Sequence, residues 1–128
     1  MTPGGEPHLV PVTFVLVDDT VWTAVDGKPK RTRRLQRLRN ITANPRASVL
    51  VDHYAEDWSQ LWWVRADGSA RVPAAGDEVA PALGALAAKY EVYRTDPPGG
   101  PFIAIDVHRW RWWAASGPGP SADDGPSR

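Results

Sequence analysis

Six runs of strand length, separated by short turn signals, constrain the fold of this chain more than any other feature. β-branched and aromatic residues, which favour strands, are frequent in these runs. Asp18-Asp19 alone separates the first two runs and predicts a hairpin, whereas Asp67-Gly68 predicts a turn or a bulge. Connections this short favour a mostly antiparallel sheet that curls into a small barrel. The predicted strands cover residues 8–17, 20–25, 47–53, 58–64, 65–72 and 102–113.

Two helices are predicted between these strands. The first is capped by Thr32 and ends before Asn44-Pro45, because proline lacks an amide donor and restricts the residue before it. Its apolar stripe consists of Leu35, Leu38 and Ile41. Asn40 falls mostly on the side opposite that stripe. The second helix covers residues 77–94, with Asp77 as its cap and apolar residues at helical spacing, and the proline- and glycine-rich stretch 97–101 ends it.

The first helix lies in a strongly basic stretch. Between Gly27 and Val51 there are eight Lys and Arg residues and no Asp or Glu, and since the chain has 15 residues of each sign, the remainder carries 7 − 15 = −8. Basic side chains around a helix start favour an anion, because the first amides of the helix are free donors. Three interpretations stay open at this point: a solvated basic face, a nucleic-acid site, or a site for a phosphorylated small molecule.

Composition narrows the class of protein. The chain has 128 residues, enough for one domain, and no cysteine, so it has neither disulfides nor cysteine-based metal sites. His8, His53 and His108 have no metal-ligand spacing. No signal pattern or membrane-spanning stretch is seen, and we expect a cytoplasmic protein. Residues 1–115 are expected to form the domain, followed by a disordered tail at 116–128 that is rich in Pro, Gly, Ser and Asp.

Seven tryptophans are unusual in a chain of this length. Six of them form two clusters: Trp58, Trp62 and Trp63, and then Trp110, Trp112 and Trp113. One small barrel is unlikely to cover so much aromatic surface, and large apolar patches usually mark interfaces. We therefore predict a homodimer.

Four segments carry a resemblance to a known family: PHLVPVTF, KPKRTRRLQRLRNITANPR, LWWVRADGSARV and RWRWW. Together with the order of elements, they resemble the pyridoxamine 5′-phosphate oxidase-like family of FMN-binding split β-barrels. More narrowly, they resemble the actinobacterial flavin/deazaflavin oxidoreductases, which use coenzyme F420. The resemblance implies a six-stranded antiparallel barrel and a homodimer with cofactor pockets at its interface. Relatives have a helix and a first strand before the segment matching GGEPHLVPV, so a barrel that lacks its first strand is the alternative.

The resemblance also implies which residues hold the cofactor. The strands matching PHLVPV and VWTAV lie along its ring system, and basic residues hold its phosphate and acidic tail. Either Trp62 or Trp63, with Trp63 taken here, approaches the ring from the other subunit. The implied cofactor-binding residues are His8, Val10, Thr23, Ala24, Lys28, Lys30, Arg34, Arg37 and Trp63. No catalytic acid, catalytic base or metal ligand is assigned.

Three functions compete at this stage. The first is an F420-dependent oxidoreductase that transfers hydride between the coenzyme and a small organic substrate, with FMN as the alternative cofactor. The second is a flavin, deazaflavin or heme binding or carrier protein without turnover, since family membership does not establish chemistry. The third, a nucleic-acid-binding module, is disfavoured because the aromatic residues do not interleave with the basic stretch as a stacking platform requires.

Overall fold

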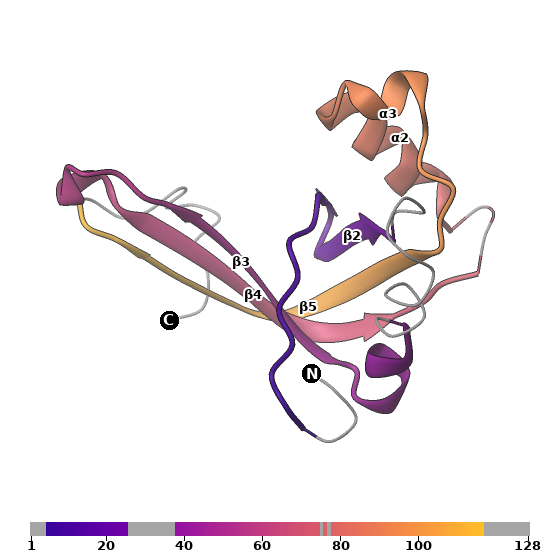
Figure 1. Cartoon of the computed structure of the whole chain (residues 1–128), viewed down its shortest axis with the longest axis horizontal. Helices are drawn as coiled ribbons and strands as arrows, with labels where there is room; N and C mark the ends of the chain where they lie inside the picture. Colours follow the sequence, from indigo (N-terminus) through magenta and orange to yellow (C-terminus); the bar gives the residue numbers. More distant parts are fainter. Residues whose placement is uncertain (1–4, 26–37, 75, 77, 117–128) are drawn as a thin grey trace.

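The computed structural model describes residues 5–25, 38–74, 76 and 78–116, which form one antiparallel sheet with helices packed on both of its faces (Figure 1). The sheet order is β1-β2-β5-β4-β3, so the last described strand lies in the middle. The strands are β1 (Val15–Val17), β2 (Thr20–Ala24), β3 (Arg46–His53), β4 (Trp62–Arg71) and β5 (Phe102–Ala114). Residues 38–43 are helical, and α2 (Ala80–Lys89), α3 (Val92–Thr95) and the 3-10 turn η1 (Trp58–Gln60) complete the fold. The predicted mostly antiparallel β fold is confirmed, with five strands in an open sheet.

Side chains alternate between the two faces of the strands, and each face has its own core. On what we call the helix-covered face, α2 packs on β1, β2 and β5. The buried residues there are Val15, Trp22, Ala24, Val79, Ala82, Leu86, Phe102 and Ala104. On the opposite face, which we call the groove face, the helical residues Leu38 and Ile41 pack against Val21, Val25, Ala70, Ile103 and Ile105. A fully buried Val, Leu, Ile or Phe side chain contributes about 1.5–3 kcal/mol, so both clusters stabilise the sheet.

Beyond the β1–β2 hairpin, β3, β4 and β5 continue as a three-stranded extension, on the left in Figure 1. We call this extension, residues 49–53, 62–66 and 110–114, the ribbon. It carries Trp62, Trp63, Trp110, Trp112 and Trp113. Trp113 is 46% exposed and Leu50 is 62% exposed, so large apolar side chains of the ribbon are left uncovered by the described chain.

Two local features shape the sheet as the sequence predicts. The β1–β2 hairpin turns at Asp18, whose φ of 55° is in the left-handed region that Asp tolerates better than most residues. The predicted irregularity at Asp67-Gly68 is a β-bulge in one continuous β4 rather than a break between two strands. A Cβ on Gly68 would lie 2.2 Å from the carbonyl oxygen of Asp106, so this position requires glycine.

Two predicted strands are shorter than expected. The strand predicted at 8–17 is reduced to β1, and residues 6–14 have no assigned secondary structure. Pro7 and Pro11 lack amide donors, which explains why this part pairs poorly with a sheet. The strand predicted at 58–64 starts only at Trp62, because Asp57 caps η1 by accepting a hydrogen bond from the Ser59 amide at 3.1 Å.

The second predicted helix is broken in two. α2 ends at Lys89, and the extended backbone of Tyr90 separates it from α3. The Arg94 side chain donates to the Ala87 and Ala88 carbonyl oxygens at 2.9 and 3.0 Å, replacing the bonds that a continuous helix would supply there. Asp77, the predicted cap, lies outside the described residues.

The helix of the basic stretch ends at residue 43, as Asn44-Pro45 predicts. Its predicted orientation is wrong at Asn40, which is only 3% exposed although the helical wheel places it outward. Leu38 and Ile41 stay half-buried, so the face toward the sheet is centred near Asn40 rather than on the apolar stripe. The described part of the chain has no helix long and apolar enough to cross a membrane.

Candidate functional site

An open groove of about 1040 Å³ runs along the sheet, and four strands contribute to its floor. The floor residues are Val21, Val49, Ala70, Ile103 and Ile105. Small-molecule sites are typically apolar with a few well-placed polar groups. An apolar floor of this extent suits the flat face of an aromatic ring system.

The segment before β1 forms a wall of the groove, through residues 7–12 and Phe14. Two tyrosines fasten its inner end. The Tyr90 hydroxyl lies 3.1 Å from both the amide nitrogen and the carbonyl oxygen of Phe14, and the Tyr93 hydroxyl lies 2.8 Å from Thr13 Oγ1. The helices α2 and α3 therefore position the groove wall although they pack on the other face of the sheet.

Basic and hydroxyl side chains gather where the groove meets the β-bulge. Arg46 of β3 pairs in register with Ser69 of β4, and Ser69 Oγ lies 3.1 Å from His108 Nε2 in a hydrogen bond. Two residues before Ser69 on β4, Asp67 pairs with Arg109. We call this region, which consists of Arg46, Ser48, Asp67, Ser69, His108 and Arg109, the bulge end of the groove. Its strand residues alternate with Ala47, Val49, Ala66 and Ala70 of the floor side, so their side chains point to the opposite face of the sheet.

The carboxylate at the bulge end has its own partners. Arg65 Nε and Nη2 donate to Asp67 at 2.9 and 3.0 Å, and Ser48 Oγ donates at 2.6 Å. Partial burial raises the pKa of Asp67, but these hydrogen bonds outweigh it and hold the pKa below its usual range. Arg46 and Arg109 are not within ion-pair distance of any described acid, but the charge of Arg109 also helps to lower the pKa of Asp67.

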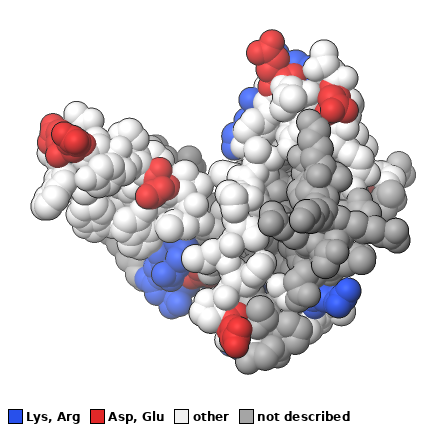
Figure 2. Space-filling model, viewed as in Figure 1, with Lys and Arg blue, Asp and Glu red and all other residues white. Residues whose placement is uncertain are grey.

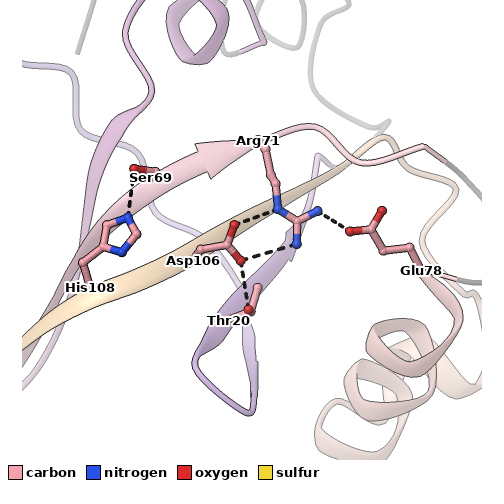
Figure 3. Close-up of polar contacts among 6 residues, drawn as sticks. All are labelled: Thr20, Ser69, Arg71, Glu78, Asp106 and His108. Carbon is pink, nitrogen blue, oxygen red and sulfur yellow. Dashed lines mark hydrogen bonds and ion pairs between the residues drawn. The ribbon is translucent and has the colours of Figure 1, made fainter.

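Next to Ser69 and His108 lies a second polar group, which we call the Arg71 cluster (Figure 3). It consists of Thr20, Arg71, Glu78 and Asp106. Arg71 Nε donates to Asp106 Oδ2 at 2.8 Å, Thr20 Oγ1 donates to Asp106 Oδ1 at 3.0 Å, and Arg71 also bonds Glu78. The hydrogen bond from Arg71 lowers the pKa of Asp106, and the two acids raise the pKa of Arg71. This cluster joins β2, β4 and β5 to the chain just before α2.

A smaller apolar cavity of about 220 Å³ lies where the ribbon begins. Phe14, Val21 and Val49 line both cavities, so the two cavities adjoin. Trp62, Val64 and Trp110 of the ribbon line the smaller one. No group of His, Asp and Glu residues suited to hold a metal ion occurs among the described residues.

Comparison with known proteins decides the family. Residues 1–114 match the pyridoxamine 5′-phosphate oxidase family. The chain belongs to this family. Its split-barrel fold accounts for the mostly antiparallel sheet described above. No curated protein matches the chain by sequence.

Solved structures of similar fold include binding proteins. A heme-binding protein from Mycobacterium smegmatis is 25% identical with a TM-score of 0.67, and the match covers 88% of this chain but only 46% of that protein. A conserved hypothetical protein from Mycobacterium tuberculosis is 18% identical, with a TM-score of 0.70 and coverages of 90% and 73%. A FAD-binding protein from Mesorhizobium loti is 19% identical, with a TM-score of 0.61 and coverages of 84% and 77%. The last two likenesses show the fold alone.

In this member of the pyridoxamine 5′-phosphate oxidase family, the predicted cofactor residues take different places. His8, Val10 and Thr23 line the groove, and Thr23 Oγ1 donates to the Thr13 carbonyl oxygen at 2.6 Å. Ala24 follows Thr23 on β2 and therefore lies on the helix-covered face, buried in its core. Trp63 lines neither cavity, whereas its neighbour Trp62 lines the smaller one.

The basic residues of the family's expected phosphate site, Lys28, Lys30, Arg34 and Arg37, lie outside the described residues. Their role stays a prediction.

Sequence reasoning missed the bulge end of the groove. His108 and Arg109 were assigned only to a strand, and Arg46 only to the basic stretch. The available signal was Gly68, since a glycine inside a strand pattern suggests a bulge or a close backbone approach. Which residues face that bulge depends on the pairing register of β3, β4 and β5, which the sequence does not reveal.

Proposed function

We propose that this protein is an F420-dependent oxidoreductase that binds the deazaflavin ring on the floor of the groove. The observation that carries the proposal is the groove itself, an open cavity of about 1040 Å³ whose apolar floor is formed by four strands. Membership of the pyridoxamine 5′-phosphate oxidase family and the FAD-binding protein of similar fold support a flavin-type ligand.

The preference for F420 over FMN rests on charge. A deazaflavin coenzyme carries a phosphate and several carboxylates on its tail, while FMN carries one phosphate. The eight basic residues between Gly27 and Val51 exceed what one phosphate needs. Exposed charge pairs are screened by salt, so raising the salt concentration should weaken F420 binding more steeply than FMN binding. Equal salt slopes in fluorescence titrations would count against a site for the tail.

The bound coenzyme would supply the hydride chemistry, and the protein would supply binding and orientation. Val21, Thr23 and Ile103 line the groove, and Thr23 bonds Thr13 of the segment before β1. No side chain is assigned as catalytic acid or base. A small organic substrate would enter along the open side of the groove.

The proposal includes a homodimer. The ribbon presents Trp62, Val64 and Trp110 around an apolar cavity, and the described chain does not fill it. A second copy that packs on this side of the ribbon would close the cavity and bring aromatic side chains to the cofactor groove. Large uncovered apolar surfaces usually mark such interfaces.

A heme-binding or flavin-binding protein without turnover is the second candidate. It is favoured by the heme-binding protein from Mycobacterium smegmatis, at 25% identity, and by the imidazole of His8, which borders the groove. This ring could ligate an iron atom above the apolar floor. This alternative requires the same groove and differs in its ligand and in the absence of hydride transfer.

One set of titrations separates the candidates. F420, FMN and heme are each added to the purified protein, and binding is followed by absorbance and fluorescence. The complex with reduced F420 is then mixed with a panel of electron acceptors, and coenzyme oxidation is recorded. Tight F420 binding with acceptor-dependent oxidation is expected. Preference for heme, or F420 binding without oxidation by any acceptor, would support the second candidate.

A further inference from the structure

We propose that the smaller cavity beside the groove is a substrate subsite, which takes an uncharged apolar group such as a single aromatic ring or a branched alkyl chain. The cavity has a volume of about 220 Å³ and adjoins the groove at Phe14, Val21 and Val49. Its role as a substrate subsite rests on the proposed function, in which the coenzyme ring occupies the groove. It adds the chemical class of the substrate, which the proposed function leaves open.

The lining of the cavity is apolar. Among the described residues, those that line it are Phe14, Leu16, Val21, Val49, Val51, Trp62, Val64, Ala66 and Trp110. None of these side chains carries a charge. In Figure 2, the ribbon is mainly white between the acidic side chains nearer its tip and the basic ones where it joins the rest of the molecule. A charged group brought into such a cavity would lose its hydration without gaining a partner, whereas an apolar group gains by leaving water.

The register of the strands explains why a hollow lies at this place. In one row across the sheet, Ala66 of β4 lies between Val49 of β3 and Trp110 of β5. Paired residues on neighbouring strands point to the same face of the sheet. A single methyl group therefore stands between two larger side chains, and the space above it is part of the cavity.

One wall of the cavity is a flat ring that is held in place. Trp62 stacks on His53, its cross-strand partner on β3, with ring centroids 5.9 Å apart and planes inclined by 17°. His53 does not line the cavity, so it supports the indole from the side away from the ligand. Aromatic side chains pack favourably against other rings. A fixed indole thus favours a flat apolar group as the occupant.

The size and position of the cavity favour a substrate group over the coenzyme. An apolar cavity of about 150 Å³ is large enough to bind benzene, so this one holds a single small group. The coenzyme, with its phosphate and carboxylates, suits the larger groove. A substrate anchored in the cavity would extend over the adjoining floor, where the coenzyme ring is proposed to lie. The proposed second copy would close the cavity from outside and exclude water from it.

The first test uses benzene as the probe and requires no coenzyme. Benzene is titrated into the full-length protein, and the methyl signals of Val51 and the indole signals of Trp110 are followed by NMR. Saturable shifts are expected. Ala66→Val narrows the hollow, and Val64→Thr places a hydroxyl in it at nearly equal size. Each substitution should weaken benzene binding about tenfold, as small changes in an apolar pocket do.

The matched controls make the same substitutions outside the cavity. Ala114 and Val107 lie on the groove face of β5 and line neither cavity. Ala114→Val and Val107→Thr should leave benzene binding unchanged. Unfolding midpoints are recorded for all four variants, and Val64→Thr decides the outcome if Ala66→Val does not fold. Equal weakening in Val64→Thr and Val107→Thr, or no saturable benzene binding because a second copy fills the cavity, would overturn the proposal.

The second test asks whether the cavity selects the substrate. Reduced F420 is bound to the protein, and electron acceptors are compared in pairs that share one reducible group and differ in an apolar substituent or a carboxylate. The apolar member should have the higher kcat/KM, and Val64→Thr should reduce this preference about tenfold without changing F420 affinity. Coenzyme oxidation without such a preference would overturn the subsite and leave the proposed function standing. Benzene binding without any binding of F420 would uphold the apolar site and refute the proposed function.

Discussion

At Gly68 the sheet leaves no room for a side chain, because β4 and β5 approach each other closely beside the bulge. An added Cβ would lie 2.2 Å from the Asp106 carbonyl oxygen and 3.0 Å from the Val107 Cα. Both neighbours are backbone atoms, which cannot rotate away. Gly68 thus allows the bulge, and the bulge sets the positions of His108 and Arg109 on β5.

Gly68→Ala should destabilise the protein by about 1–3 kcal/mol, the usual cost of forcing extra atoms into a packed region. Gly84→Ala is the matched control. Gly84 lies within α2 and its Cβ would meet nothing within 4 Å, so alanine should stabilise by roughly 0.5–1 kcal/mol. Urea unfolding measures both changes. A Gly68 variant as stable as the parent would show that the close approach is not real.

Asp106 gives a prediction about pH. Its pKa is lowered in the folded protein, so the unfolded chain binds the proton more readily. The stability it contributes is complete above the ordinary carboxylate pKa of about 4 and is lost as the pH falls through the lower folded value. Asp106→Asn should therefore lower stability at neutral pH and flatten the loss of stability in acid.

Unfolding curves recorded from neutral to acidic pH test this expectation. Asp52→Asn is the control, because Asp52 is exposed and forms no ion pair with a described residue. It should retain the acid dependence of the parent. An Asp106 variant with the same acid dependence as the parent would contradict the role given to the Arg71 cluster.

Among the elements, α2 and α3 act on the groove from the far side of the sheet. Their tyrosines hold Thr13 and Phe14, which lead from the groove wall into β1. Tyr90 lies in extended backbone directly after α2, and Tyr93 lies in α3, so the two tyrosines contact neighbouring residues of the same segment.

Tyr90→Phe removes the hydroxyl that pairs with the Phe14 amide and carbonyl. The expected cost is about 1–3 kcal/mol, since the Phe14 groups lose their partner. Hydrogen exchange at the Phe14 amide should accelerate, which reports loosening of the wall directly. Tyr54→Phe serves as the control, because Tyr54 is 72% exposed and should show neither effect. Unchanged exchange at Phe14 in the Tyr90 variant would refute the fastening role.

Most elements were predictable from the sequence, for identifiable reasons. β2, β3 and β5 have enough β-branched and aromatic residues for their bounds to be found within a few positions. The prediction of a single helix over 77–94 was wrong because the spacing of apolar residues carries no information about the Tyr90–Phe14 hydrogen bonds, which join residues 76 positions apart. The predicted outward orientation of Asn40 was wrong for a similar reason: tertiary packing, and not the apolar stripe, decides which face of the helix contacts the sheet.

The candidate site was less predictable than the fold. His8, Val10 and Thr23 were predicted because they lie in segments that resemble the family; all three line the groove, and their role in cofactor binding stays a prediction. Arg46, His108 and Arg109 come together only through the register of three strands and one bulge. The sequence does not show whether Trp62 or Trp63 faces the groove side. Strand alternation requires only that the two side chains point to opposite faces of the sheet.

For the whole molecule, the ribbon is the feature that a second copy would cover. We predict a dimer at micromolar concentration in sedimentation velocity. Trp62→Ala should weaken it markedly, because Trp62 lines the apolar cavity of the ribbon, whereas Trp63→Ala should have a much smaller effect because Trp63 lines neither cavity. A stable monomer of the unaltered protein, or equal effects of the two substitutions, would contradict the proposed interface.

The central place of β5 has a consequence for how the chain is made. β1 pairs with β2 and β3 pairs with β4, but these two hairpins meet only through β5, which follows them in the sequence. An isolated two-stranded hairpin is marginally stable in water. While the ribosome holds residues 102–114, the nascent chain therefore has two unjoined hairpins with their apolar faces open. Protection by a chaperone matters most during that interval, and emergence of the thirteen residues of β5 ends it.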